Sequence, residues 1–585
     1  MNTMDNIYRN DCLVRKTYLS FVTVSVLSTL AATIGLLVDN IIAGQLIGPE
    51  TLGIMGIVSP ISLIFSAIGN IFASGGTARA AHALGKGDHR EMSGIFSITI
   101  LFLMICGVLI TLPGLIFPEQ IAVMLGARDE LLPMARDYIF GFFMGALPTL
   151  MTTALMGYLK IDGSPRLPLV AIVVMTVMNI ILDIIMVVVF ELGMFGMALA
   201  TSLSYVAAVA VACTHFLRPV SSLRLVKPSG IPKELSAMLI TGAPTAANRI
   251  FDTVKTVVLN IMLISLVSSG AVAVLNIRNQ ANNFLGAITM GMGTAILPVA
   301  GMFYGEGDRT ALKDTLKSAI RLGVTANSII AVLIILFPEA LPSLLGIEGA
   351  DTLQMASAAM IMFAVSMPLR ALNMAFINFY QATKKPVLSL VLCSLQSLIY
   401  TLAASVILIF PMDSDGVWLA FVLGEALTII TLAVIIAIRN KRFPRSFDDL
   451  MMLDKSTEKD RNKLEFSTDG SIDEIKYISD QLYDFCLTYM SDEKSAKDLS
   501  ACVEEICSDI VKHSFTNGRR QWLDITFINQ NNEITIRFRD NGKPFDHMKQ
   551  ITSVNTDDGI LRIKESAKSI SYKRSIGLNS LSLTL

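Results

Sequence analysis

Two aspartates lie inside long apolar segments, where a carboxylate can bind a proton or a cation. Residues 21–38 carry no charge, and Asp39 and Asn40 then precede another apolar run. A second apolar segment carries Asn179 and Asp183, which four-residue spacing puts on one face of a helix. A carboxylate inside a membrane is costly, so each acid marks a functional site by default.

The depth of the two acids indicates that they share one site. At 1.5 Å per residue, Asp39 lies about 34 Å along a helix from Lys16, and Asp183 about 22 Å from Pro168. Both are therefore expected in the outer half of the bilayer. Because two carboxylates in one cavity repel each other, a proton or a Na⁺ ion is expected to bind there. The alternative is an aspartate that only reaches an interface or pairs silently with a neighbouring helix.

A second charged group follows later in the chain. Arg249, Asp252 and Lys255 are spaced three residues apart, so adjacent members can pair on one helix face. Arg278, Arg370 and Glu425 are also expected inside the membrane, facing a central cavity or one another. An internally neutralised triplet is the alternative for the first group. The residues predicted to line a substrate cavity are Asn40, Asp252, Asn260, Arg278 and Glu425.

Composition sets the class of protein. The chain has 585 residues, of which 53% are hydrophobic and 16% charged, with a mean hydropathy of +0.59. These values indicate a membrane protein, with a soluble segment after about residue 440. A net charge of −1 provides no basic stripe for nucleic acid. The seven cysteines show no CxxC pair, so neither a disulfide framework nor a zinc site is expected.

Apolar runs predict an all-α membrane domain of twelve helices. The expected spans are 17–47, 53–84, 92–117, 132–160, 167–190, 194–217, 236–268, 271–302, 313–338, 354–382, 386–411 and 415–439. Lys and Arg gather in alternate loops, which predicts a multi-pass protein of the plasma membrane with both termini cytoplasmic. Residues 1–16 then form a retained cytoplasmic leader.

The twelve helices are expected to form two repeats of six. A shift of 220 residues places Ala80 to Asp88 on Ala300 to Asp308, so that GKGD falls on GEGD, and places Asn40 on Asn260. Residues 17–220 and 221–440 are therefore predicted lobes with the same topology, with a site at their interface.

In this pattern the chain resembles the multidrug and toxic compound extrusion (MATE) transporters. The resemblance covers roughly residues 10–440. It rests on the two GxGD motifs and on the ordered motifs Lys160 to Pro165, Asn179 to Asp183, Gly196 to Thr201, Phe379 to Ala382 and Gly416 to Trp418. It implies a secondary transporter and not an enzyme, with H⁺ or Na⁺ as coupling ion and no cofactor needed for transport.

The resemblance also implies site residues. Asp39, Asn179, Asp183 and Thr201 match the cation-coupling network of one MATE branch. Where that network has a further Asn, this chain has Met156 and Gly157. The resemblance therefore does not decide whether the coupling ion is H⁺ or Na⁺. The acids favour an organic cation as the exported small molecule. Two other functions are alternatives: a membrane-anchored sensor whose kinase-like tail binds or phosphorylates a cytoplasmic regulator, and a lipid or glycolipid flippase.

The tail has a different periodicity. After a charged linker, 441–465, helices are expected near 471–490 and 495–515 and a strand hairpin near 521–528 and 533–539. Glu505, Asp509 and His513 lie four residues apart on one helix face, and Asp540 opens the motif Asp-Asn-Gly-Lys-Pro-Phe-Asp.

These two motifs resemble the ATP-binding domain of the GHKL superfamily, particularly the anti-sigma-factor kinases. The resemblance implies an α+β domain at 466–585 that binds ATP and Mg²⁺ or a cytoplasmic regulatory protein. Glu505 would be the base, Asp509 the Mg²⁺ ligand and Asp540 the adenine contact, with Gly542 and Gly559 in the nucleotide loops. Asp509 replaces the expected Asn and a single glycine replaces the glycine-rich lid, so a degenerate domain is expected.

Overall fold

The computed structural model describes most of the chain in two compact units. The described ranges are 8–48, 50–129, 131–217, 221–227, 230–344, 349–453, 462–489, 493–516, 520–530, 533–545 and 567–584. One unit comprises residues 21–452 and is helical. The other comprises residues 1–20 with 453–585 and contains a sheet.

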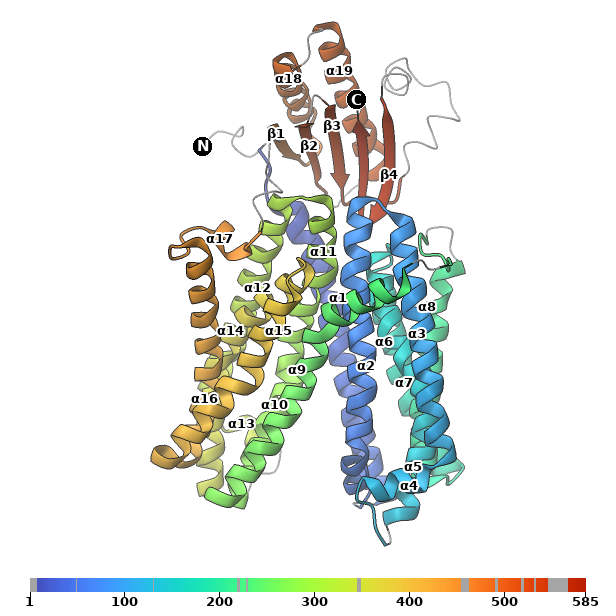
Figure 1. The fold of residues 1–585 in the computed structure, drawn as a ribbon, viewed down its shortest axis with the longest axis vertical. Helices are drawn as coiled ribbons and strands as arrows, with labels where there is room; N and C mark the ends of the chain where they lie inside the picture. The colour runs from blue at the N-terminus through green and yellow to red at the C-terminus, as the bar shows by residue number, and fades with distance from the viewer. Residues whose placement is uncertain are drawn as a thin grey trace. The chain divides into compact units, whose positions relative to one another are not determined.

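The helical unit consists of long helices that form two bundles (Figure 1). The first bundle contains α1 (Cys12–Ile42, from Phe21 on), α2 (Glu50–Lys86), α3 (His89–Ile116), α4 (Pro118–Met124), α5 (Leu131–Met144), α6 (Ala146–Ile161), α7 (Leu167–Ile184) and α8 (Gly193–Cys213). The second contains α9 (Ile231–Leu266), α10 (Ser269–Thr294), α11 (Ile296–Glu306), α12 (Arg309–Leu336), α13 (Ala340–Leu344), α14 (Ala350–Ala382), α15 (Pro386–Ser394) and α16 (Tyr400–Asn440), followed by α17 (Phe447–Met451). We call these bundles the N-lobe and the C-lobe.

The expected twelve spans are not confirmed by length and apolarity. Within the described residues, nine helical stretches are long and apolar enough to cross a membrane, or up to ten if the bent pair α5 and α6 counts as one span. The stretch Pro386–Asn440 counts once, although Asp413 has non-helical angles (φ 48°, ψ −132°) where two helices meet. Helix α9 is outside the count and carries Arg249, Asp252 and Lys255.

The two GxGD motifs fold in the same way. Gly87 and Gly307 have positive φ angles of 81° and 69°, which glycine adopts at low cost where a helix ends. The next residue, Asp88 or Asp308, caps the following helix by accepting a hydrogen bond from a backbone N–H three residues later, at 2.8 and 2.9 Å. The motif is therefore a helix–turn–helix joint that occurs once in each lobe.

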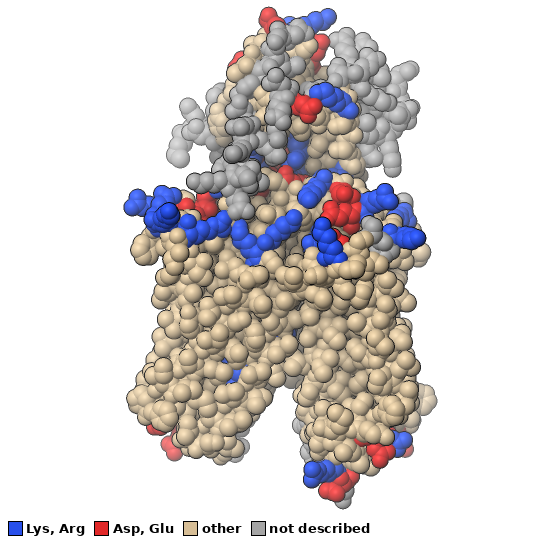
Figure 2. Space-filling view, viewed as in Figure 1, with Lys and Arg blue, Asp and Glu red and all other residues tan. Residues whose placement is uncertain are grey.

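The lobes contact each other through α2, which packs against α9 and α11. Small residues bring the backbones together: a Cβ on Gly75 would lie 2.1 Å from the Met238 carbonyl oxygen, and one on Gly242 would lie 2.1 Å from that of Ile71. An ion pair between Arg79 and Glu234 also joins the lobes. At the opposite end the lobes separate and leave a hollow between them (Figure 2).

The tail has a five-stranded antiparallel sheet in the order β1-β2-β3-β5-β4. Its strands are β1 (Asn462–Thr468), β2 (Leu523–Gln530), β3 (Glu533–Asp540), β4 (Ser569–Ser575) and β5 (Leu578–Thr584), and its helices are α18 (Ile472–Tyr489) and α19 (Glu493–Ser514). Inward residues form one row across four strands, Phe466, Ile525, Phe538 and Leu581, and pack in one core with residues of both helices. The two expected helices and the hairpin are therefore present.

The leader and the linker differ from the expectation. Helix α1 begins at Cys12, inside the predicted leader 1–16, and residues 462–465 of the predicted linker belong to β1. Tyr8 pairs with Phe466 as an antiparallel bridge, and Arg9 forms an ion pair with Glu465. The start of the chain therefore extends the exposed edge of the tail sheet, which hydrophobic periodicity within the tail alone cannot reveal.

Candidate functional site

The N-lobe acids meet at the amide of Asn179. Its Nδ2 donates to Asp39 Oδ1 at 2.6 Å and to Asp183 Oδ2 at 2.8 Å. Asp183 is fully buried, and its Oδ1 has no hydrogen-bond partner among the described residues. Helices α1 and α7 thus place two carboxylates in one site, and the orphaned oxygen provides a position for a proton or a small cation.

The polar support for this pair comes from α8 and α5. Ser204 Oγ donates to Asn179 Oδ1 at 3.2 Å, which directs the amide nitrogen toward the acids. The phenol of Tyr138 lies within electrostatic range of both acids. Thr201, which the sequence placed in this network, instead donates to the Met197 carbonyl oxygen of its own helix at 3.1 Å. Asn40 is half-buried beside Asp39.

Each helix that supplies an acid changes winding just beyond it. Helix α1 passes into a π-helical turn at Ala43–Ile47, and α7 passes into one at Ile185–Val189. A third π turn, Leu395–Ile399, contains Gln396, which bonds the buried Glu425. Such turns concentrate at functional sites because they release backbone groups from the regular helical pattern.

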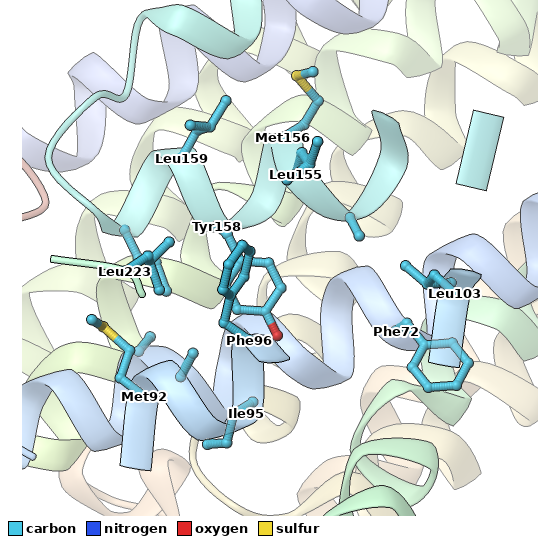
Figure 3. Close-up of a cluster of buried hydrophobic side chains, with 14 of the residues drawn as sticks. Phe72, Met92, Ile95, Phe96, Leu103, Leu155, Met156, Tyr158, Leu159 and Leu223 are labelled. Atoms are coloured by element: carbon cyan, nitrogen blue, oxygen red, sulfur yellow. The ribbon is translucent and has the colours of Figure 1, made fainter. Parts of the chain in front are cut away.

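The missing Asn of the N-lobe network has a packing explanation. Met156 is 8% exposed and lies in an apolar cluster between α2, α3 and α6, together with Leu155 and Leu159 (Figure 3). At Gly157 a Cβ would lie 2.2 Å from Thr77 Oγ1, so an Asn side chain does not fit there. This part of α6 contributes to the core rather than to ion binding.

The C-lobe gathers the other charged residues predicted from the sequence. Asp252 Oδ1 accepts from Lys255 Nζ at 2.6 Å. The guanidinium of Arg278 lies 3.3 Å from the ring centroid of Phe421, and the side chain is 5% exposed. Arg370 donates to Asn282 Oδ1 and lies within electrostatic range of Asp252 and Arg278.

Buried amides hold the remaining acid of the C-lobe. Glu425 Oε2 accepts from Asn373 Nδ2 at 2.7 Å and from Gln396 Nε2 at 2.8 Å. Asn260 has a buried Oδ1 without a hydrogen-bond partner among the described residues. Within the described residues, no hydrogen bond or ion pair joins Asn260 to this cluster or Asn40 to the acid pair, so their place in a cavity stays a prediction.

The tail motif converges on Asp540. Its Oδ1 accepts from Ser514 Oγ at 2.6 Å, from the Gly542 backbone N–H at 2.8 Å and from Asn579 Nδ2 at 2.9 Å. These partners join the end of α19, the loop after β3, and β5. A Cβ on Gly542 would lie 2.2 Å from Ser514 Oγ, so this close approach requires glycine. The carboxylate is thereby fixed at the end of the central strand, β3.

The helix residues of the tail motif lie on one face of α19. Asp509 Oδ1 is 3.3 Å from His513 Nε2, and the His513 ring stacks on Phe545 at 5.0 Å between centroids. Glu505 lies one turn before Asp509 and is half-buried. Gly559 lies outside the described residues. Among the residues that are described, no three His, Cys, Asp or Glu side chains form a metal site, so a Mg²⁺ ion at Asp509 would need phosphate oxygens as further ligands.

Comparison with known proteins identifies the helical part. The MatE family model matches residues 25–185 and again 244–407, which is more than half of the chain. The chain belongs to the MatE family. Each lobe thus carries one copy of the family pattern, as the 220-residue repeat predicted.

Relatives place this MatE protein among multidrug exporters. It is 28% identical over 331 residues to the multidrug export protein MepA of Staphylococcus saprophyticus, covering 55% of this chain and 72% of the relative. It is 25% identical over 311 residues to MepA of Staphylococcus aureus strain MRSA252, covering 52% and 68%. The family model and these relatives support a multi-pass membrane transporter for efflux.

Solved structures share the fold. An outward-facing multidrug resistance MATE transporter superimposes with a TM-score of 0.67 at 22% identity, over 72% of this chain and 94% of that one. The Vibrio cholerae MATE transporter VcmN in its bent form gives 0.68 at 19% identity, over 75% and 99%.

Several residues of the MatE site escaped the sequence reasoning. Ser204 lies one turn of α8 after Thr201, on the same helix face, and its hydroxyl donates to Asn179. Asn373 and Gln396 are polar amides in apolar helices, and this polarity is the sequence feature that could have marked them as site residues. Asn579 lies on β5, where alternating residues give no indication of a contact with Asp540.

Proposed function

We propose that the protein exports organic small molecules in exchange for H⁺ or Na⁺, with Asp39 and Asp183 as the coupling site. The observation that carries this proposal is the single Asn179 amide that donates to both carboxylates. In a membrane, two acids this close repel each other, and one bound proton or cation relieves the repulsion. Binding and release of that ion would then change the packing of α1 against α7.

Alternating access is the proposed route. The lobes touch at the end where α2 meets α9 and α11, and a hollow separates them at the other end (Figure 2). Lys and Arg gather at the closed end (Figure 2). Lys86 ends α2 and Arg309 begins α12, next to the contact between Gly85 and Gly305. Because basic residues favour the cytoplasmic side, we infer that the hollow opens to the outside and that both chain ends are cytoplasmic. Twelve spans, six in each lobe, agree with this arrangement if the bent pair α5 and α6 is one span, α9 spans, and the stretch broken at Asp413 spans twice.

For the tail we propose a regulatory nucleotide-binding domain of GHKL type. Support comes from the fixed carboxylate of Asp540 and from Glu505 and Asp509 on α19. When bound, Mg²⁺ would neutralise phosphate charge, with Asp509 as its protein ligand. Helix α1, which carries Asp39, begins within the unit that contains the tail, so nucleotide or a cytoplasmic regulatory protein has a covalent route to the coupling site.

Transport is tested with the purified full-length protein in proteoliposomes. A fluorescent organic dye is loaded, and its movement is followed with an imposed H⁺ gradient, an imposed Na⁺ gradient, or neither. We expect one gradient to accelerate dye movement several-fold, which also identifies the coupling ion. Equal rates in all three conditions would contradict ion-coupled export.

Nucleotide binding is tested separately with a fluorescent ATP analogue and Mg²⁺. Glu505→Gln and Asp509→Ala are expected to weaken binding, whereas Glu504→Gln, a matched change next to Glu505, is the control. Saturable binding that neither variant weakens would argue against this nucleotide site.

A further inference from the structure

Three guanidinium groups of the C-lobe lack a carboxylate partner among the described residues. Arg249 on α9, Arg278 on α10 and Arg370 on α14 form no ion pair within the described ranges. The cluster to which they belong contains four basic residues, Arg249, Lys255, Arg278 and Arg370, and two acidic residues, Asp252 and Glu425. Its formal charge therefore has an excess of two positive charges, at a depth where unpaired charge is costly.

Arg278 is the most buried of the three. It is 5% exposed, and its guanidinium lies between Phe421, with 3.3 Å to the ring centroid, and Phe363, with 5.4 Å. Cation–π contact stabilises the charge and covers the faces of the group, so its N–H donors point outward in the plane. No hydrogen bond from these donors is formed within the described part of the chain. A buried cation held in one orientation with its donors unused fits a ligand oxygen.

Among the described residues, the hydrogen-bond partners of Arg249 and Arg370 are neutral. Arg249 is exposed in the middle of α9, and its Nη2 lies 3.3 Å from Met290 Sδ. Arg370 donates to the amide oxygen of Asn282. Charged side chains at this depth face a water-filled cavity rather than lipid. Arg370 lies within electrostatic range of both Arg249 and Arg278, so the three guanidinium groups belong to one cluster.

The two acids of the cluster are already engaged. Asp252 binds Lys255 at 2.6 Å, and Glu425 accepts from Asn373 and Gln396. Internal neutralisation, the alternative for Arg249, Asp252 and Lys255, thus accounts for only one basic and one acidic residue. Glu425 lies within electrostatic range of Arg278 and Arg370 and offsets one further positive charge, which leaves the excess of two.

We propose that this C-lobe cluster binds an anionic group of the exported molecule, a carboxylate, sulfonate or phosphate on an organic compound. Arg278 provides a planar fork that matches such a group, and Arg249 and Arg370 add charge at its side. This rests on the proposed export function and changes its expected substrate. Asp39 and Asp183, which share the Asn179 amide, are the proposed site of the coupling ion. The basic cluster of the C-lobe would then bind an anionic or zwitterionic substrate.

The test is equilibrium binding to the purified full-length protein in detergent, with carboxyfluorescein as the probe and fluorescence anisotropy as the readout. We expect saturable binding that competing benzoate displaces. Arg278→Gln should weaken it about tenfold or more, since a charge-assisted pair is lost, and Arg278→Lys should weaken it less. Arg321→Gln, which removes an exposed arginine of α12, should leave it unchanged.

Two results would overturn the anion site: no saturable binding of carboxyfluorescein, or equal binding by wild type and a folded Arg278→Gln variant. Size-exclusion profiles and thermal unfolding establish that each variant is folded. The gradient-driven dye assay is independent of this readout. Gradient-driven movement of ethidium by a protein that fails to bind carboxyfluorescein would refute the anion site and retain coupled export.

Discussion

Gly85 and Gly305 face each other where the two lobes meet. A Cβ on Gly85 would lie 2.8 Å from the Gly305 Cα, and a Cβ on Gly305 would lie 3.0 Å from the Gly85 Cα. The two residues are 220 positions apart, which is the repeat spacing of the sequence. Equivalent positions of the two lobes therefore touch, as residues next to a two-fold axis do.

This contact predicts a strong effect of one methyl group. In Gly85→Ala the new Cβ would lie 2.1 Å from the Met302 carbonyl oxygen, and in Gly305→Ala it would lie 2.2 Å from that of His82. Each change should destabilise the closed end by about 1–3 kcal/mol. Thermal unfolding in detergent and cysteine crosslinking between α2 and α11 measure the loss.

The control is Gly94→Ala on α3, where nothing lies within 4 Å of the new Cβ. It should be neutral or stabilising by up to about 1 kcal/mol, because alanine favours helix. If Gly85→Ala behaves like Gly94→Ala, the backbones at the lobe contact are further apart than described.

The sequence predicted what depends on local pattern and repetition. The 220-residue shift anticipated the paired GxGD joints, because glycine and aspartate have defined roles at helix ends. The same reasoning gave the helices and hairpin of the tail. The spacing of Asn179 and Asp183 indicated one helix face, and the structure adds that Asp39 reaches the same amide.

Long-range pairing was beyond the sequence. The bridge from Tyr8 to Phe466 joins residues more than 450 positions apart, and no periodicity encodes such a contact. The span count also differed, because charges in α9 and the break at Asp413 interrupt the apolar signal. Thr201 was assigned to the cation-coupling network from the family resemblance. In the structure its hydroxyl donates a hydrogen bond to the backbone of its own helix, as helical Thr residues often do.

The docked leader predicts that Arg9 stabilises the first strand of the tail. Its side chain is 4% exposed, bonds Glu465 and lies 3.8 Å from the buried Asp524. Arg9→Ala should destabilise the docked leader by about 1.5–3 kcal/mol. Hydrogen exchange of the full-length protein should then show faster exchange of the β1 amides, Asn462–Thr468.

Arg15→Ala is the matched control for the leader. Arg15 is 46% exposed and lies 4.0 Å from Asp11, so its loss should cost no more than about 0.5 kcal/mol. Unchanged β1 exchange in Arg9→Ala would mean that the leader does not hold the sheet edge.

Two of the three tail thiols, those of Cys486 and Cys507, should be unreactive in the folded protein. Burial raises the pKa of Cys486 to about 11 and raises the pKa of Cys507 further. The reactive thiolate is therefore scarce at neutral pH and becomes more abundant only in strong base. Mass spectrometry after maleimide treatment at pH 7 should find both thiols unmodified, and both modified after denaturation. Rapid labelling of native Cys507 at pH 7 would show that the core of α19 opens.

The most direct measurement of ion coupling compares gradient-driven export by wild type, Asp39→Asn, Asp183→Asn and Asp137→Asn in proteoliposomes at equal protein density. Asp137 is an exposed aspartate of α5 and serves as the matched control. The shared Asn179 amide predicts that both Asp39→Asn and Asp183→Asn abolish the stimulation by the H⁺ or Na⁺ gradient, whereas Asp137→Asn retains it. Full gradient stimulation in either folded Asp39→Asn or folded Asp183→Asn would contradict the assignment of the acid pair as the coupling site.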